Sequence, residues 1–153
     1  MKIRPLLDKY ETVVSWLQSP LLLLIRFYWG LAFAQDGWGK LHHLGRVTEY
    51  FASIGIPFPQ ANVILAASTQ CLCGSLLLLG LFARVAAFPL VCTMLVAYVT
   101  AEREALNAII SDTDKFVTAT PFLFLLASLI VLAFGPGRLS LDWLLFRRKT
   151  GTG

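Results

Sequence analysis

The stretch that decides the fold is PLLLLIRFYWGLAFAQDGW, residues 20–38, an apolar run that carries an arginine at position 26. A helix needs about 20 apolar residues to cross the hydrocarbon core of a bilayer, so this run is long enough to span one. Three more apolar runs of similar length follow, at Ala61–Phe82, Val85–Ala101 and Phe116–Phe134. The sequence therefore predicts an all-α membrane protein, folded as an antiparallel four-helix transmembrane bundle.

Composition supports this class of protein. The 153-residue chain is 57% hydrophobic and 14% charged, with a mean hydropathy of +0.70. Soluble domains are nearer 45–50% apolar and about 25% charged. The net charge of +4 does not indicate nucleic-acid binding, because the charges cluster at the ends of the apolar runs and form no basic stripe. Membrane lipids are the expected partners.

The sequence divides the chain into three predicted parts. Residues 1–19 alternate apolar and polar side chains at helical spacing, which predicts a cytoplasmic interfacial helix before the membrane. Ser19 and Pro20 are typical of a helix N-cap followed by its first residue, so a new helix is expected there. Residues 20–146 then form the membrane domain, and residues 147–153 a basic cytoplasmic tail.

Lysine and arginine counts give the orientation. Eight of these residues fall on the side that holds both termini and four on the other, with Arg26 inside the first span. The positive-inside rule therefore places both termini in the cytoplasm. Two loops on the outer side carry short amphipathic stripes, which lie on the membrane surface or close over the bundle as lids; their apolar residues are Val47, Tyr50, Phe51 and Ile54, and Leu106, Ile109 and Ile110.

One face of the first span combines glycines with polar and aromatic residues. Arg26, Gly30, Phe33, Gly37 and Lys40 recur at steps of three and four residues and so share a face. Glycines there allow a neighbouring helix to approach closely. We expect helix packing at Gly30, Gly37, Ala66 and Gly74. Arg26 either reaches headgroups or a backbone carbonyl, or meets an anionic group or a quinone carbonyl.

A second polar feature is expected in the outer half of the bundle. Asp36 can pair with Lys40 one turn away, and Gln70 in the second span lies at a similar depth. A buried amide needs hydrogen-bond partners. Asp36, Tyr98 and either Thr118 or Thr120 are the candidates. This cluster is either a helix-packing network or a ligand site, and the ligand-site hypothesis takes Arg26, Phe33, Asp36, Lys40 and Gln70 as contacts to a quinone or lipid.

No residue pattern indicates a metal site or a catalytic group. Cys71, Cys73 and Cys92 all fall within predicted spans and are expected to be unpaired core residues. His42 and His43 are adjacent, so on a helix they point about 100° apart and rarely bind one ion. Asp142 is expected to cap a short inner helix together with Ser140 or to pair with Arg138.

The order of several motifs resembles the DoxX-like (DoxX/DoxD) membrane proteins. These motifs are Ile25-Arg26 with Gly30, Phe33 and GWGKL at 37–41, then GIPFP at 55–59, GSLLLLGLFAR at 74–84 and GPGRLSLD at 135–142. The resemblance covers residues 20–146 and implies a four-helix bundle in a bacterial or archaeal cytoplasmic membrane. Relatives include subunits of a thiosulfate:quinone oxidoreductase. Many relatives carry a glutamate where this chain has Gln70, so a proton relay at that position is not expected here.

These observations predict a small accessory subunit of a quinone-linked redox or electron-transfer complex, in contact with quinone or lipid and with no covalently or metal-bound cofactor of its own. The expected partners are other subunits of that complex, or further copies of this chain. Two alternatives remain open. One is a purely structural subunit of a larger respiratory or photosynthetic assembly, and the other is a small-solute transporter, although no inverted repeat is visible.

Overall fold

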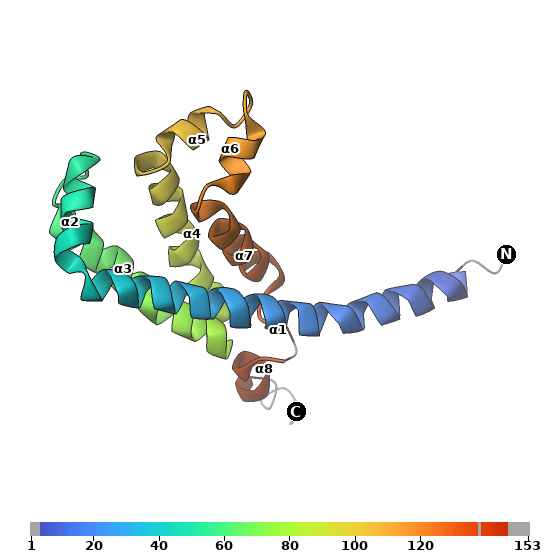
Figure 1. The fold of residues 1–153 in the computed structure, drawn as a ribbon. Helices are drawn as coiled ribbons and strands as arrows, with labels where there is room; N and C mark the ends of the chain where they lie inside the picture. Colours follow the sequence, from blue (N-terminus) through green and yellow to red (C-terminus); the bar gives the residue numbers. More distant parts are fainter. Residues whose placement is uncertain (1–3, 138, 147–153) are drawn as a thin grey trace.

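The computed structural model describes the backbone of residues 4–137 and 139–146, with the side chains of residues 17–137 and 139–145. All regular structure in these residues is helical (Figure 1). The helices are α1 Arg4–His42, α2 Leu44–Ser53, α3 Pro59–Leu79, α4 Ala83–Thr100, α5 Arg103–Asn107, α6 Thr113–Thr118, α7 Pro121–Phe134 and α8 Leu141–Phe146. Within this part of the chain, Leu17–His42, Pro59–Leu79 and Ala83–Thr100 are long and apolar enough to cross a membrane, and α7 is a shorter apolar helix. The predicted helical membrane fold is confirmed.

Helix α1 begins before the predicted first span. It runs without interruption from Arg4 to His42, with Pro20 inside it. The prediction that Ser19 caps a new helix at Pro20 is therefore wrong. A proline removes only one backbone hydrogen bond, and helix growth is cooperative once a nucleus exists, so the long flanking segments keep the helix intact. The tail at 147–153, and all of the apolar stripe predicted for residues 1–19 except residues 17–19, lie outside the side chains that the structure describes.

A tight turn joins α3 to α4, as predicted for an antiparallel hairpin. Gly80 ends α3 in the left-handed region at φ 68°, where glycine has no steric penalty. The amide of Gly80 donates to the Leu77 carbonyl at 3.1 Å, and the amide of Leu81 donates to the Leu76 carbonyl at 3.0 Å. These bonds satisfy two carbonyls at the end of α3 and fix a tight turn. Helix α4 then starts at Ala83, three residues after Gly80.

The predicted fourth span, Phe116–Phe134, is not one helix. It is divided into α6 and α7, because Ala119 adopts an extended conformation with φ −61° and ψ 138°. Pro121 is the cause: it has no N–H to continue α6, but it is well suited to the first position of a new helix. Helix α7 has 14 residues, which corresponds to about 21 Å of helix. The membrane-crossing part of this region is therefore shorter than the sequence suggested.

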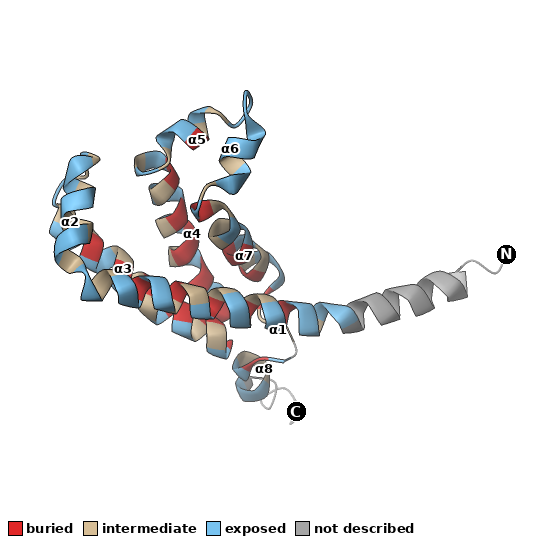
Figure 2. Ribbon diagram, viewed as in Figure 1, coloured by how far each residue is buried: buried red, intermediate tan, exposed pale blue. Residues whose placement is uncertain are grey.

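The helices form two antiparallel pairs. Helix α1 lies along α3, and α4 lies along α7, with the α3–α4 turn connecting the pairs (Figure 1). Buried residues follow the sides of α1, α3, α4 and α7 that face one another, and exposed residues the outward sides (Figure 2). Many of the exposed residues on these helices have large apolar side chains. The core is made chiefly of Phe33, Leu77, Ala86, Ala87, Leu90, Met94 and Val131. Outward apolar faces of this kind are expected where lipid replaces water.

The short helices mark the two ends of the bundle. Helix α8 lies beside the α3–α4 turn at one end, called here the α8 end, and α2, α5 and α6 lie at the other, the α2 end (Figure 1). The stripe that includes Val47 and Phe51 falls largely on α2, which packs against α3. The stripe predicted from Leu106 to Ile110 is not continuous on one helix, because α5 ends at Asn107 and Ile110 is almost fully exposed.

An ion pair connects α5 to α6 at the α2 end. Lys115 Nζ donates to Glu104 Oε2 at 2.9 Å. The hydrogen bond from Lys115 and then its charge lower the pKa of Glu104, and the same two effects raise the pKa of Lys115. The pair therefore stabilises the fold between these two pKa values. Its contribution disappears as the pH falls through the lowered pKa of Glu104, or rises through the raised pKa of Lys115.

We expect the Lys115→Ala variant to raise the pKa of Glu104 towards the value of an unpaired glutamate. Carboxyl-carbon NMR titration of Glu104 in detergent micelles measures this change directly. An unchanged Glu104 titration in the variant would show that the pair does not form in solution.

Candidate functional site

Three glycines bring α1 and α3 into backbone contact. A Cβ atom at Gly30 would lie 2.7 Å from the Leu78 amide nitrogen, and one at Gly37 would lie 2.6 Å from the Ala67 carbonyl oxygen. A Cβ atom at Gly74 would lie 2.7 Å from the Cβ of Phe33. Small residues let helices approach this closely. Ala66 is only half-buried, and it is its neighbour Ala67 that meets Gly37.

A polar cluster lies one turn beyond this contact, towards the α2 end. Lys40 donates one hydrogen bond to Asp36 Oδ2, on its own helix, and a second to Gln70 Oε1 at 2.8 Å across to α3. Gln70 is 1% exposed, whereas the side chains of Lys40 and Asp36 are 24% and 42% exposed. The cluster Asp36–Lys40–Gln70 is thus anchored in the α1–α3 interface and open on one side.

The cluster has hydrogen-bond donors to spare. An ammonium group has three N–H bonds, and within the described residues Lys40 uses two of them. Because Gln70 accepts from Lys40 through Oε1, its Nε2 amide remains a donor without a partner among the same residues. The cluster can therefore donate to a ligand that carries acceptor oxygens.

The other partners expected for Gln70 are used elsewhere. Tyr98 donates from its hydroxyl to the Phe116 carbonyl at 3.0 Å and stacks on the Phe116 ring. Thr118 donates to the Asp114 carbonyl at 2.6 Å, and Thr120 is exposed. The expected contribution of Tyr98 and Thr118 to the cluster is therefore wrong, because the break before α7 turns this segment towards α4 and supplies local carbonyls. The direct Lys40–Gln70 bond was not predicted, although a four-carbon side chain one turn beyond Gly37 is long enough to reach it.

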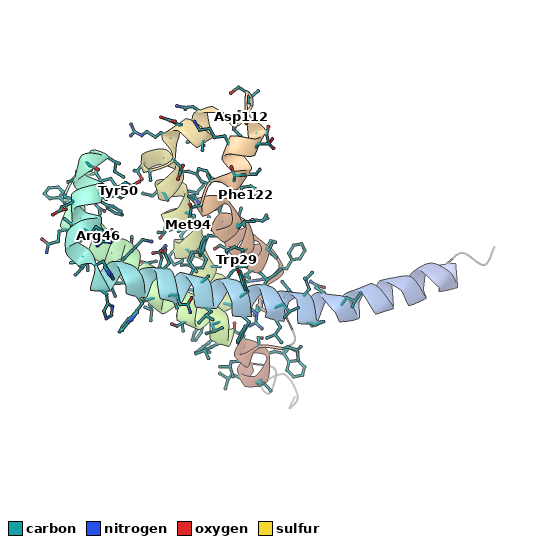
Figure 3. The ribbon with its side chains drawn as sticks, in the orientation of Figure 1. Trp29, Arg46, Tyr50, Met94, Asp112 and Phe122 are labelled. Carbon is teal, nitrogen blue, oxygen red and sulfur yellow. The ribbon has the colours of Figure 1, made fainter. Side chains whose placement is uncertain are left out.

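Phe33 belongs to the core. It is fully buried, and its ring contacts Phe124 of α7 edge to face, with 4.7 Å between ring centroids. Trp29, labelled in Figure 3 where α1 passes α7, contacts the same Phe124 ring at 4.9 Å. These rings fill the space between the two helix pairs next to Gly74. Phe33 therefore contributes to the packing between the two helix pairs.

Arg26 lies at the opposite end of the α1–α3 interface. It is 1% exposed and donates to the carbonyls of Leu22, at 3.4 Å, and of Leu139, in the segment before α8. Its Nη1 is buried and has no hydrogen-bond partner among the residues that the structure describes. It lies over Gly80, where a Cβ atom would be only 1.7 Å from Nη1. Since 14 residues separate it from Lys40, about 21 Å of helix, Arg26 cannot share one small ligand with the polar cluster.

Asp142 and Ser140 cap two different helices. Asp142 accepts from the backbone amides of Phe82, at 2.7 Å, and Ala83, at 3.1 Å, at the start of α4. Ser140 accepts from the Trp143 amide at 3.2 Å at the start of α8. Asp142 and Ser140 were expected to cap the inner helix together. Ser140 does cap that helix, but the expectation is wrong for Asp142, which instead connects α8 to the start of α4. The alternative pairing with Arg138 lies outside the described residues.

Removing the Asp142 cap should destabilise the fold. We expect Asp142→Ala to lower the free energy of unfolding by about 0.5–2 kcal/mol, the usual loss for an N-cap side chain. Thermal unfolding in mild detergent, followed by circular dichroism, measures the difference. Asp114→Ala is the matched control, because the described residues show hydrogen bonding only through the backbone carbonyl of Asp114. Equal melting temperatures for the two variants would contradict the capping role.

The described residues contain no group of three histidine, cysteine or acidic side chains that could hold a metal ion. His42 and His43 each bond a backbone carbonyl one turn back, those of Trp38 and Gly39. All three cysteines are free thiols, but the core location expected for Cys92 is wrong, since this residue is exposed on α4 where lipid would surround it.

Glycine-packed apolar helices, with an open polar cluster near one end and a buried arginine near the other, define a multi-span helical membrane protein. The DoxX family model matches residues 21–103. The uncharacterized membrane protein Rv3486 of Mycobacterium tuberculosis is 34% identical over 141 residues, which cover 88% of this chain and 86% of the relative. The chain belongs to the DoxX family. No solved structure matches it.

Proposed function

We propose that this chain is a small membrane subunit of a quinone-linked redox complex, and that its Asp36–Lys40–Gln70 cluster contacts the quinone. The observation that carries the proposal is the pair of unused donors, on Lys40 and on Gln70, held at one place in the α1–α3 interface. A quinone presents two carbonyl oxygens, which accept hydrogen bonds and donate none. The donor set of the cluster fits that chemistry.

Each residue of the cluster has a separate part in this proposal. Gln70 is fixed by burial, so its amide has a defined direction. Lys40 bridges the two helices and offers its remaining proton to a carbonyl oxygen, and Asp36 keeps the ammonium group in place. A bound quinone would supply electron-accepting chemistry to partner subunits, and the charged Lys40 donor would stabilise negative charge on a quinone oxygen.

The exposure of the cluster supports a role as a subunit. Asp36 and Lys40 are partly exposed, so α1 and α3 together supply one wall of a binding site. Pockets for small ligands bury most of the ligand surface. A partner subunit would supply the opposite wall. Arg26 has no part in this contact, because its buried guanidinium bonds backbone carbonyls at the other end of α1.

A photoreactive azidoquinone tests the contact. Native membranes are labelled, the chain is purified, and the modified peptides are identified by mass spectrometry. We expect labelling of peptides that contain Lys40 or Gln70, reduced about tenfold in Gln70→Leu, since one hydrogen bond to a ligand contributes about 1–1.5 kcal/mol.

Ser75→Ala is the matched control for this experiment. Ser75 is an exposed polar residue of the same helix, and its hydroxyl donates to the Cys71 carbonyl of α3 itself. Its labelling should equal that of the unaltered chain. Labelling that is unaffected by Gln70→Leu, or that falls on other helices, would contradict the proposed contact.

A further inference from the structure

The α8 end of the bundle carries an open groove that the proposed function does not use. Its volume is about 560 Å³, within the range of about 300–1,000 Å³ that small-ligand sites occupy. Phe82, Val85, Pro136 and Trp143 give it apolar walls, and Arg84 and Asp142 are its charged residues. It is therefore an amphipathic groove beside the ends of three apolar helices.

Arg84 is held in place within this groove. Its Nη2 donates to the Ala133 carbonyl at the end of α7, at 3.3 Å. Its guanidinium packs over Gly135, where a Cβ atom would lie 3.0 Å from Nε. Gly135 is buried and has φ 80°, a conformation that residues with a Cβ atom rarely adopt, so glycine is favoured at this position. A guanidinium has five N–H donors, which leaves most of those on Arg84 available beside the groove.

The carboxylate of Asp142 bonds the backbone of α4 and not Arg84. Both of its oxygens accept backbone amides at the start of α4, and it makes no ion pair with Arg84 within the described residues. Arg84 is thus the cation of the groove that keeps unused donors, and bases next to a membrane attract anionic lipids.

The geometry points to a binding site for one anionic phospholipid, with its headgroup phosphate on the guanidinium of Arg84 and its upper acyl chains along Phe82 and Val85. The position matches the layout of a lipid, since Val85 is exposed on the outward face of α4 where acyl chains would lie. An Arg–phosphate contact is frequently bidentate, which fits a guanidinium oriented by Ala133 and Gly135. This site is independent of the quinone contact at the other end of the bundle.

Native mass spectrometry tests the site on the full chain, purified in detergent and delipidated. It is titrated with dioleoyl phosphatidylglycerol and, separately, with dioleoyl phosphatidylcholine. We expect the first phosphatidylglycerol to bind at least fivefold more tightly than phosphatidylcholine, and Arg84→Ala to remove that preference. Arg84→Lys keeps the charge and should keep a part of the preference.

Arg103→Ala is the matched control. Arg103 is an exposed arginine at the α2 end that also donates to a backbone carbonyl, that of Val99. Its removal should leave phosphatidylglycerol binding unchanged, and circular dichroism should show that each variant is folded. Equal binding of the two lipids to the unaltered chain, or an unchanged preference in Arg84→Ala, would overturn the inference. Displacement of the lipid by millimolar inorganic phosphate would also overturn it, since the site would then recognise a free anion.

Discussion

Replacing Gly80 with alanine should lower the free energy of unfolding by about 2–5 kcal/mol. Two costs add at this position. The backbone has φ 68°, and the left-handed conformation costs a residue with a Cβ atom about 1–2 kcal/mol. The new methyl group would also lie 1.7 Å from Nη1 of Arg26 and 2.9 Å from the Cβ of Ser140. Overpacking of this kind costs about 1–3 kcal/mol, because the guanidinium is buried and would have to shift.

Two further variants separate these costs. Gly55→Ala places alanine at a similar φ of 78° where no atom lies within 4 Å, so it should show only the backbone part. In an Arg26→Ala background, most of the steric cost of Gly80→Ala should disappear. The difference between the effects of Gly80→Ala with and without Arg26 is the coupling energy between the two positions. Unfolding by SDS titration from mixed micelles measures the unaltered chain and the four variants, which are Gly80→Ala, Gly55→Ala, Arg26→Ala and the double variant. Equal effects of Gly80→Ala with and without Arg26 would contradict the contact.

Replacing Gly37 with alanine should lower the free energy of unfolding by about 1–3 kcal/mol. A Cβ atom there would meet the Ala67 carbonyl at 2.6 Å and the Cys71 amide at 2.7 Å. Both are backbone groups of α3, so neither can rotate away and the two helices must move apart. Because Lys40 lies one turn further along α1, its hydrogen bond to Gln70 should weaken as well. Azidoquinone labelling should therefore decrease together with stability.

Gly39→Ala is the matched control for this prediction. Gly39 lies in the same helix, two residues away, and a Cβ atom there would meet nothing within 4 Å. Alanine is the better helix former, so this variant should be neutral or more stable by up to about 1 kcal/mol. If Gly37→Ala and Gly39→Ala gave equal stabilities and equal labelling, the close α1–α3 contact would not exist in the membrane.

Much of the fold could be predicted from the sequence, because the length of an apolar run and the residues of a turn determine structure locally. The apolar runs and the Gly80 turn correspond to α3 and α4 within a few residues. Two of the failures involve proline. Pro20 lies within a helix that was expected to begin there, and Pro121 divides a helix that was expected to be continuous. A proline is compatible with either outcome, and the packing of distant segments decides between them.

The candidate site was less predictable because its contacts are tertiary. Helical spacing placed Asp36 and Lys40 together, but the pairing of Lys40 with Gln70 depends on how α1 and α3 are aligned. That alignment is set by backbone contacts at Gly30, Gly37 and Gly74. Arg26 could be expected to bond a carbonyl, but not the one at Leu139, because the position of the segment before α8 depends on the whole bundle.

Purification of the chain from its native membrane in mild detergent tests the central claim most directly. The co-purifying proteins are identified by mass spectrometry, and extracted quinone is quantified per chain for the unaltered protein and for Gln70→Leu. The account predicts recovery in a complex with redox-cofactor-bearing subunits, with bound quinone that is reduced about tenfold in the variant. Recovery of the chain alone and without quinone, or in a complex whose quinone content is the same in Gln70→Leu, would contradict it.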